Sequence, residues 1–306
     1  SFYNMADAFF VGKIGTSATA AVGVVFPLMS IIQALGFFFG HGSGNSISRK
    51  LGAKEHDSAE QLASAGFFSA LFCGLLIAVF GLLFLKPLAL ALGSTDTILP
   101  YTEDYLGIIL LGAPYMTAQL VLNNQLRFQG SAFYAMIGIT SGAVLNIILD
   151  PLFIFVFDMG ISGAALATVI SQFVSFVLLL LGSHFAGCIP IRLKNIRCIP
   201  KCFSEIAKGG LPSLFRQGLG SVATIALNLA ANPYGDAAIA AMSIVMRVTF
   251  FASSALIGFG QGFQPVCGFN YGARRYDRVR EAFWFCVRVS SVFSLIAAVV
   301  GFALSP

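Results

Sequence analysis

The stretch ISGAALATVISQFVSFVLLLLGSHFAG (161–187) contains no Asp, Glu, Lys or Arg. About 20 consecutive apolar residues are enough for a helix to cross a lipid bilayer. Six further apolar runs recur along the chain, at 62–85, 106–122, 132–157, 211–231, 237–269 and 282–304. None of them alternates in polarity as the ~10-residue strands of a membrane β-barrel do. The sequence therefore predicts an all-α polytopic membrane protein.

The composition agrees with this prediction. Hydrophobic residues make up 57% of the 306 residues and charged residues only 10%, whereas soluble domains carry about 25% charged residues. We expect nine membrane spans, at 1–13, 24–47, 60–85, 100–127, 132–157, 161–187, 206–231, 237–268 and 280–304. Both ends of the chain lie within apolar runs, so we expect a protein truncated at both ends.

The basic residues gather in alternate loops between these spans. One set of loops holds 13 of the 18 Lys and Arg residues: Arg49, Lys50, Lys54, Arg127, Arg192, Lys194, Arg197, Lys201, Lys208, Arg274, Arg275, Arg278 and Arg280. The other set holds Lys13 and Lys86. The positive-inside rule makes the first set cytoplasmic. Because the positive charges lie in these loops, we expect no nucleic acid partner.

An internal repeat appears when the chain is shifted by 220 residues. The segment GTSATAAVGVV (15–25) then aligns with GDAAIAAMSIV (235–245), FGHG (39–42) with FGQG (259–262), and GAKEHD (52–57) with GARRYD (272–277); 11 of 43 positions are identical without a gap. Both copies have the same orientation in the membrane, as in transporters built from parallel repeats.

The repeat predicts two lobes. The N-lobe would comprise residues 1–187 with helices 1–6, of which the first is truncated. A cytoplasmic inter-lobe loop would follow at 188–208. Residues 209–306 would form a partial C-lobe with helices 7–9, so that nine of twelve helices are present.

Polar residues inside the apolar runs are candidates for function. The segment NIILDPLFIF (146–155) places Asn146 and Asp150 four apart, on one helical face, and a charge at the bilayer centre costs about 2.5–3.5 kcal/mol on insertion scales. Asp7 lies eight residues before Gly15 and Asp150 lies eight before Asp158, both in outer loops, and Thr168 lies eight residues after Gly160 of the second loop. At 1.5 Å per residue they all lie ~12 Å inward.

The chemistry of these four side chains favours a coupling-ion site. Carboxylate, amide and hydroxyl oxygens are ligands for hard cations, while two neighbouring carboxylates hold a proton between them. Pro151 frees the carbonyl of Ile147 and permits a kink. In the alternative reading, the two Asp side chains only lock helices together. The repeat argues against it, since the position equivalent to Asp7 is Leu227.

Five segments together resemble the multidrug and toxic compound extrusion (MATE) transporters, in particular their DinF-like branch: ADAFFVGKIGTSATAAVG (6–23), NIILDPLFIF (146–155), GISGAALATVISQ (160–172), GLPSLFRQGLGS (210–221) and GFGQGFQPVCGFNYGARRYDRV (258–279). The resemblance implies twelve helices in two lobes around a central cleft. It also implies a monomeric antiporter in the cell membrane of a bacterium or archaeon, which exports organic, often cationic and amphipathic drugs in exchange for H⁺ or Na⁺. It implies neither enzymatic activity nor a cofactor besides the coupling ion.

The resemblance implies roles for individual residues as well. The cation site of the family falls on Asp7, Asn146, Asp150 and Thr168, and neighbouring polar positions of the site or substrate cleft fall on Tyr3, Tyr105 and Asn123. The depth count supports the first four and places Asn123 nearer the inner end. No carboxylate lies within helices 7 and 8, which disfavours the C-lobe mechanism of the other main branch. No metal is expected beyond Na⁺ at the cation site.

Three alternatives stay open at this stage. A flippase for lipid-linked saccharides would need more basic residues in the cleft, and Arg216 and Arg247 are the only candidates. An intramembrane aspartyl protease would use Asp7 and Asp150, but its Gly-x-Gly-Asp context is absent from NIILDP. A membrane scaffold is the third. The sequence does not choose between H⁺ and Na⁺ and does not identify the substrate.

Overall fold

A computed structural model shows the architecture and describes residues 9–231 and 236–304. Within these residues the chain is helical and contains no strand. The helices, in chain order, are α2 (Thr16–Gly52), α3 (His56–Leu83), α4 (Leu85–Ala91), α5 (Leu99–Phe128), α6 (Ala132–Pro151) continued by a π-helical turn (Leu152–Val156), α7 (Gly160–Phe185), a 3₁₀ helix (Leu193–Cys198), α8 (Ile199–Ala231), α9 (Asp236–Gly272) and α10 (Tyr276–Leu304). The predicted all-α fold is confirmed.

Six of the described helices are long and apolar enough to cross a membrane: Thr16–Gly52, His56–Leu83, Leu99–Phe128, Ala132–Val156, Gly160–Phe185 and Tyr276–Ala303. The predicted spans 206–231 and 237–268 correspond to α8 and α9. The predicted span 1–13 falls mostly outside the described residues. Two features were not predicted. One is the short α4, and the other is the early start of α8, within the expected loop 188–208.

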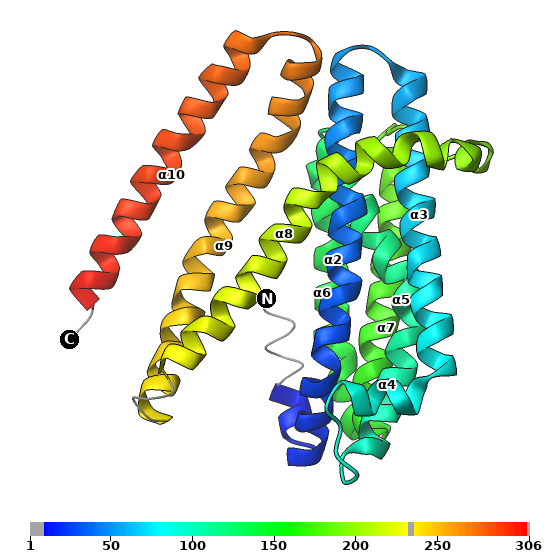
Figure 1. The fold of residues 1–306 in the computed structure, drawn as a ribbon, viewed down its shortest axis with the longest axis vertical. Helices are drawn as coiled ribbons and strands as arrows, with labels where there is room; N and C mark the ends of the chain where they lie inside the picture. The colour runs from blue at the N-terminus through cyan, green and yellow to red at the C-terminus, as the bar shows by residue number, and fades with distance from the viewer. Residues whose placement is uncertain (1–8, 232–235, 305–306) are drawn as a thin grey trace.

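The internal repeat is also a structural repeat. Helices α2 and α9 both have 37 residues, and each end of α9 lies 220 residues after the corresponding end of α2. The turns that follow are alike: Lys54 has a φ of 63° and Arg274 a φ of 57°. Ala53 N donates to Arg49 O at 3.0 Å, and the equivalent bond from Ala273 N measures 2.9 Å. Both turns lie at the same end of the molecule (Figure 1).

The first half is a bundle around α5, which contributes to two buried apolar clusters. One cluster lies toward the predicted outer side and includes Val25, Tyr105 and Ile161. The other lies toward the basic turns and includes Leu122 and Leu179. Small residues let the helices approach closely, as is usual for helix packing in membranes. The candidate site lies on the helices α6 and α7 of this bundle, in contact with α5 and α2.

The segment between the two halves is held against the first half. Ile189 N donates to Gln129 Oε1 at 2.8 Å, and Asn195 Nδ2 donates to Glu60 Oε1 at 3.0 Å. Glu60 also forms an ion pair with Arg192, at 3.3 Å. The first turns of α8 continue this packing, because Ile206 is fully buried in the inner cluster. The connecting segment, residues 189–206, is therefore packed against the first half, and we call it the strap.

Candidate functional site

The centre of the site is a buried polar group on α6 and α7. Asn146 and Asp150 lie one turn apart on α6, and Thr168 faces them from α7. Asn146 Nδ2 donates to Asp150 Oδ1 at 3.2 Å and lies 3.5 Å from Thr168 Oγ1. Their exposed fractions are 3%, 0% and 4%. The depth count thus predicted this convergence correctly, while the role of the three residues in ion binding stays a prediction.

The backbone of α6 changes at Pro151, directly after the buried carboxylate. Since Pro has no N–H, it cannot bond to the carbonyl one turn earlier. The α-helix ends at this residue, and the π-helical turn closes with a bond of 3.0 Å from Phe157 N to Leu152 O. Such π turns inside helices occur often at functional sites. The predicted irregularity therefore takes the form of a π turn next to Asp150.

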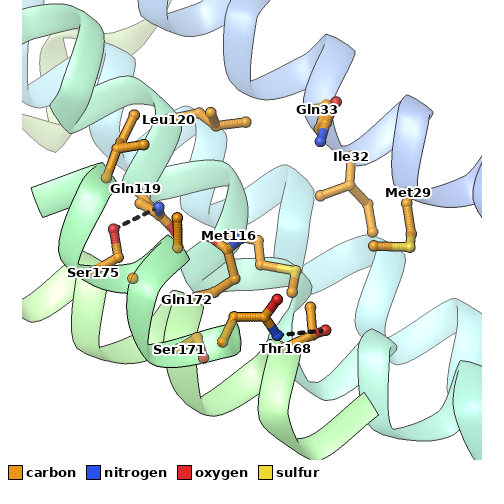
Figure 2. Close-up of a pocket in the computed structure, with 14 residues that line it drawn as sticks. Met29, Ile32, Gln33, Met116, Gln119, Leu120, Thr168, Ser171, Gln172 and Ser175 are labelled. Atoms are coloured by element: carbon orange, nitrogen blue, oxygen red, sulfur yellow. Dashed lines mark hydrogen bonds between the residues drawn. The ribbon is translucent and has the colours of Figure 1, made fainter. Parts of the chain in front are cut away.

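A cavity of about 120 Å³ adjoins this group between α2, α5, α6 and α7. Figure 2 shows its lining, which mixes apolar, amide and hydroxyl side chains and contains no charged residue. The lining residues are Met29, Ile32, Gln33, Met116, Gln119, Leu120, Ile139, Gly142, Ala143, Asn146, Thr168, Ser171, Gln172 and Ser175. A cavity of this kind suits an amphipathic ligand, because apolar walls hold the ligand body and a few polar groups orient it.

Two buried carbonyl oxygens in this lining have no hydrogen-bond donor among the described residues. They are Asn146 Oδ1 and Gln119 Oε1. The amide nitrogen of Gln119 is engaged, since it donates to Ser175 Oγ at 2.8 Å, and this hydroxyl donates to Gly138 O at 2.7 Å. A buried acceptor without a partner costs about 1–3 kcal/mol. An occupant that donates hydrogen bonds, or a cation, would offset this cost.

Of the other predicted site residues, two lie on α5 and two lie outside the described residues. Tyr105 is fully buried in the outer apolar cluster. Asn123 donates to the carbonyl oxygen of Ala135 at 3.0 Å. Ala135 lies eleven residues before Asn146 on α6, which corresponds to a distance of roughly 16 Å along the helix. The structure does not bring Asn123 to the buried group. Tyr3 and Asp7 fall outside the described residues.

Sequence reasoning missed the amide and hydroxyl side chains of the cavity. Gln33, Gln119 and Gln172 come from three different helices, and Ser175 connects two of them. A signal in the sequence could have identified them. Each Gln lies in the middle of an apolar run, and an amide side chain is costly to bury there without a hydrogen-bond partner. Among the described residues, no three His, Cys, Asp or Glu side chains come together as a metal site requires.

Comparison with known proteins decides the family. The family model MatE matches residues 1–152 and 212–306. The chain belongs to the MatE family. The MatE chain is thus a membrane transporter and not an enzyme, as predicted from the resemblance. Its assignment to the DinF-like branch stays a prediction.

Among the relatives of this MatE chain is the multidrug export protein MepA of Staphylococcus aureus, which is 30% identical over 98% of the chain and 68% of its own length. A solved MATE structure in a bent conformation has a TM-score of 0.90 at 29% identity, over 98% of the chain and 67% of its own. An outward-facing multidrug resistance MATE transporter of the MOP superfamily has a TM-score of 0.87 at 28% identity, over 99% and 68%. The chain spans about two thirds of the length of these relatives.

Proposed function

We propose that this protein is an antiporter that exports organic, mainly cationic and amphipathic compounds in exchange for H⁺ or Na⁺. The observation that carries the proposal is a fully buried carboxylate, Asp150, bonded to Asn146 beside a cavity with unpaired acceptors. The relative from Staphylococcus aureus is named a multidrug export protein, which supports the same activity here. We place the protein in the cell membrane of a bacterium or archaeon, as a monomer that binds no nucleic acid.

The coupling ion would bind at Asp150, Asn146 and Thr168, with Asp7 of the first helix as the fourth member. The described members fit a hard cation, because a carboxylate, an amide carbonyl and a hydroxyl supply only oxygen ligands. They fit a proton as well, since two neighbouring carboxylates, here Asp150 and Asp7, would hold a proton between them. In both cases the ion neutralises the charge of Asp150. A neutral group has a lower cost of burial, so ion binding would favour tighter packing of α6 against its neighbours.

The cavity favours a substrate with a protonated amine on an apolar body. Its walls include Met29 and Met116, and Met side chains adapt to ligands of different shape. The free oxygens of Asn146 and Gln119 are acceptors for such an amine. A flippase for lipid-linked saccharides would need basic side chains in its cleft. The lining of this cavity contains no cationic side chain. Arg216 is not among the lining residues, and the side chain of Arg247 falls outside those described.

Uptake of a fluorescent organic cation into inverted vesicles, whose outer surface is the cytoplasmic face, tests the proposal, because uptake there corresponds to export from the cell. The variants Asp150→Asn and Asp7→Asn remove one carboxylate each, and we expect both to lose ion-driven export. The matched control is Asp158→Asn, because Asp158 is exposed at the end of the same helical segment. Imposing the pH gradient and the Na⁺ gradient separately identifies the ion. Export at the unmodified rate in both site variants would contradict the proposal.

A further inference from the structure

At the end of the molecule that carries the basic turns, α2 and α9 cross with their backbones in direct contact. A Cβ atom added to Gly52 would lie 2.1 Å from the carbonyl oxygen of Phe269, and one added to Gly272 would lie 1.9 Å from that of Arg49. Real Cβ atoms do not approach other atoms closer than 3.0 Å, and here the obstacle is backbone. Any side chain at either position would therefore push the two helices apart.

These two contacts are one contact made twice. Gly52 and Gly272 are equivalent in the 220-residue repeat, and so are the two residues whose carbonyl oxygens they approach. Ser48 and Gly268, also equivalent, face each other, since a Cβ atom on Gly268 would lie 1.9 Å from Ser48 Oγ. Reciprocal contacts of this kind are the signature of a two-fold axis. The two halves thus meet at this crossing on the axis that relates them.

Open space borders the crossing. Cavities of about 470, 560 and 500 Å³ flank it, and residues from both halves line each of them. Toward the other end of α9, Cβ atoms on Gly258, Gly260 and Gly262 would meet nothing within 4 Å. Figure 1 shows α9 leaving α2 in that direction. A permanent core is packed with few voids, so the crossing resembles a contact that can separate.

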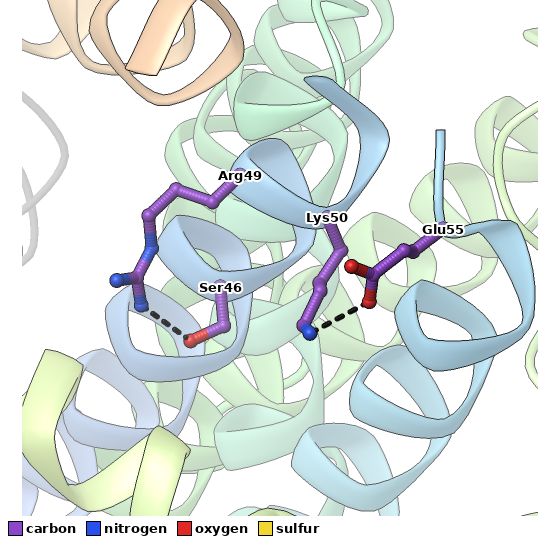
Figure 3. A network of polar contacts seen from close by, with 4 residues as sticks. All are labelled: Ser46, Arg49, Lys50 and Glu55. Carbon is purple, nitrogen blue, oxygen red and sulfur yellow. Dashed lines mark hydrogen bonds and ion pairs between the residues drawn. The ribbon is translucent and has the colours of Figure 1, made fainter. Parts of the chain in front are cut away.

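The charged side chains at the end of α2 are engaged within their own half. Arg49 Nη2 donates to Ser46 Oγ at 3.2 Å, and Lys50 forms an ion pair of 2.7 Å with Glu55 (Figure 3). The hydrogen bond from Lys50 and its positive charge lower the pKa of the Glu55 carboxyl. Within the described residues, no ion pair joins the first half to α9 or α10. Separating the halves here therefore breaks no charge pair.

We infer that Gly52 and Gly272 are positioning residues of an inner gate. Their reciprocal contact closes the cytoplasmic side of the protein, and the gate opens when the two glycines separate. This inference rests on the proposed function, because a transporter must alternate between two states that differ at this end. A side chain at either glycine would destabilise the closed state and favour the inward-open one.

Labelling from the inner side tests this inference. The reporter is Gln264→Cys, in a background without other cysteines, because Gln264 lines a cavity at the crossing. We expect Gly52→Ala and Gly272→Ala to raise the labelling rate by a membrane-impermeant maleimide on the order of tenfold, the factor that about 1.4 kcal/mol makes in an equilibrium. The controls Gly23→Ala and Gly260→Ala should leave it unchanged, since their Cβ atoms meet nothing.

Unchanged labelling in both glycine variants would overturn the inference. Labelling requires no export, so it is independent of the proposed coupling. Export at the unmodified rate in both Asp150→Asn and Asp7→Asn would refute the coupling and leave the labelling result standing.

A second measurement leaves both glycines in place, in case their variants do not fold. Spin labels at Lys54→Cys and Arg274→Cys report the separation of the two exposed turns beside the crossing. We expect two populations of distance, of which the shorter corresponds to the closed gate. Where the Gly52→Ala and Gly272→Ala proteins fold, the longer population should grow. A single short distance in the unmodified protein would overturn the inference.

Discussion

At the scale of single residues, Thr168 contributes one hydroxyl to the buried group, with its Oγ1 3.5 Å from Asn146 Nδ2. Thr168→Val removes this oxygen from the proposed ion ligands. A single hydrogen bond contributes about 0.5–1.5 kcal/mol, and about 1 kcal/mol is roughly five-fold in affinity. We expect the ion concentration for half-maximal export to rise about five-fold by this measure. Thr168→Ser is the control, because it keeps the hydroxyl. An unchanged ion dependence in Thr168→Val would exclude its role.

Ser175 has a structural role that can be separated from transport. Its hydroxyl accepts from Gln119 Nε2 at 2.8 Å and donates to Gly138 O at 2.7 Å, which ties three helices together. Ser175→Ala leaves the buried amide nitrogen of Gln119 without its acceptor, at about 1–3 kcal/mol. We expect a lower midpoint of thermal unfolding in detergent. The exposed Ser204→Ala serves as control, and equal midpoints for the two variants would refute this role.

At the scale of elements, the π turn after Pro151 is the feature of α6 that best lends itself to a test. Pro151→Ala restores an N–H, which can then bond to the carbonyl of Ile147 and extend the α-helix. We expect slower hydrogen exchange of the amides of 152–157, measured by mass spectrometry, together with reduced export. Pro100→Ala is the control, since this Pro occupies the first turn of α5, where no hydrogen bond is lost. Unchanged exchange at 152–157 would show that the π turn does not depend on Pro151.

The strap between the halves depends on Glu60 of α3. This carboxylate accepts from the buried Asn195 and pairs with Arg192, whose side chain is half exposed. Exposed ion pairs contribute little, so the bond from Asn195 should dominate. We expect Glu60→Ala to release the strap and to accelerate trypsin cleavage after Arg192 several-fold in inverted vesicles. Asp104→Ala, on an exposed residue of α5, is the control. Equal cleavage rates would refute the proposed attachment.

At the scale of the whole molecule, the sequence was sufficient for the repeat and for the spans that lie within the described residues. Apolar runs long enough to cross a bilayer have few alternative structures. The shift of 220 residues needs no gap, so it defines which residues of the two copies are equivalent. Depth counting also brought Asn146, Asp150 and Thr168 to one layer. The cavity beside them could not be predicted, because contacts such as Gln119 to Ser175 depend on how helices distant in sequence rotate against each other. The glycine crossing was missed for the same reason.

The motion that the repeat predicts is a separation of two halves at their inner end. Arg127 of α5 donates to Gln261 of α9 across this end. A short thiol-specific cross-link between Arg127→Cys and Gln261→Cys should therefore hold the inner side closed. We expect it to abolish export and a reductant to restore it.

The matched control for this cross-link joins two residues of the same half. Gln125 Nε2 donates to Ser43 Oγ at 3.0 Å, and both residues lie in the first half. Cross-linking Ser43→Cys to Gln125→Cys should leave export intact, because these helices move together. All four residues lie toward the inner end of their helices. The two pairs therefore differ mainly in whether the cross-link joins the first half of the protein to the second. Equal loss of export in the two pairs would show that inner cross-links inhibit without any gate, and full export through a completely linked Arg127–Gln261 pair would show that this contact does not open.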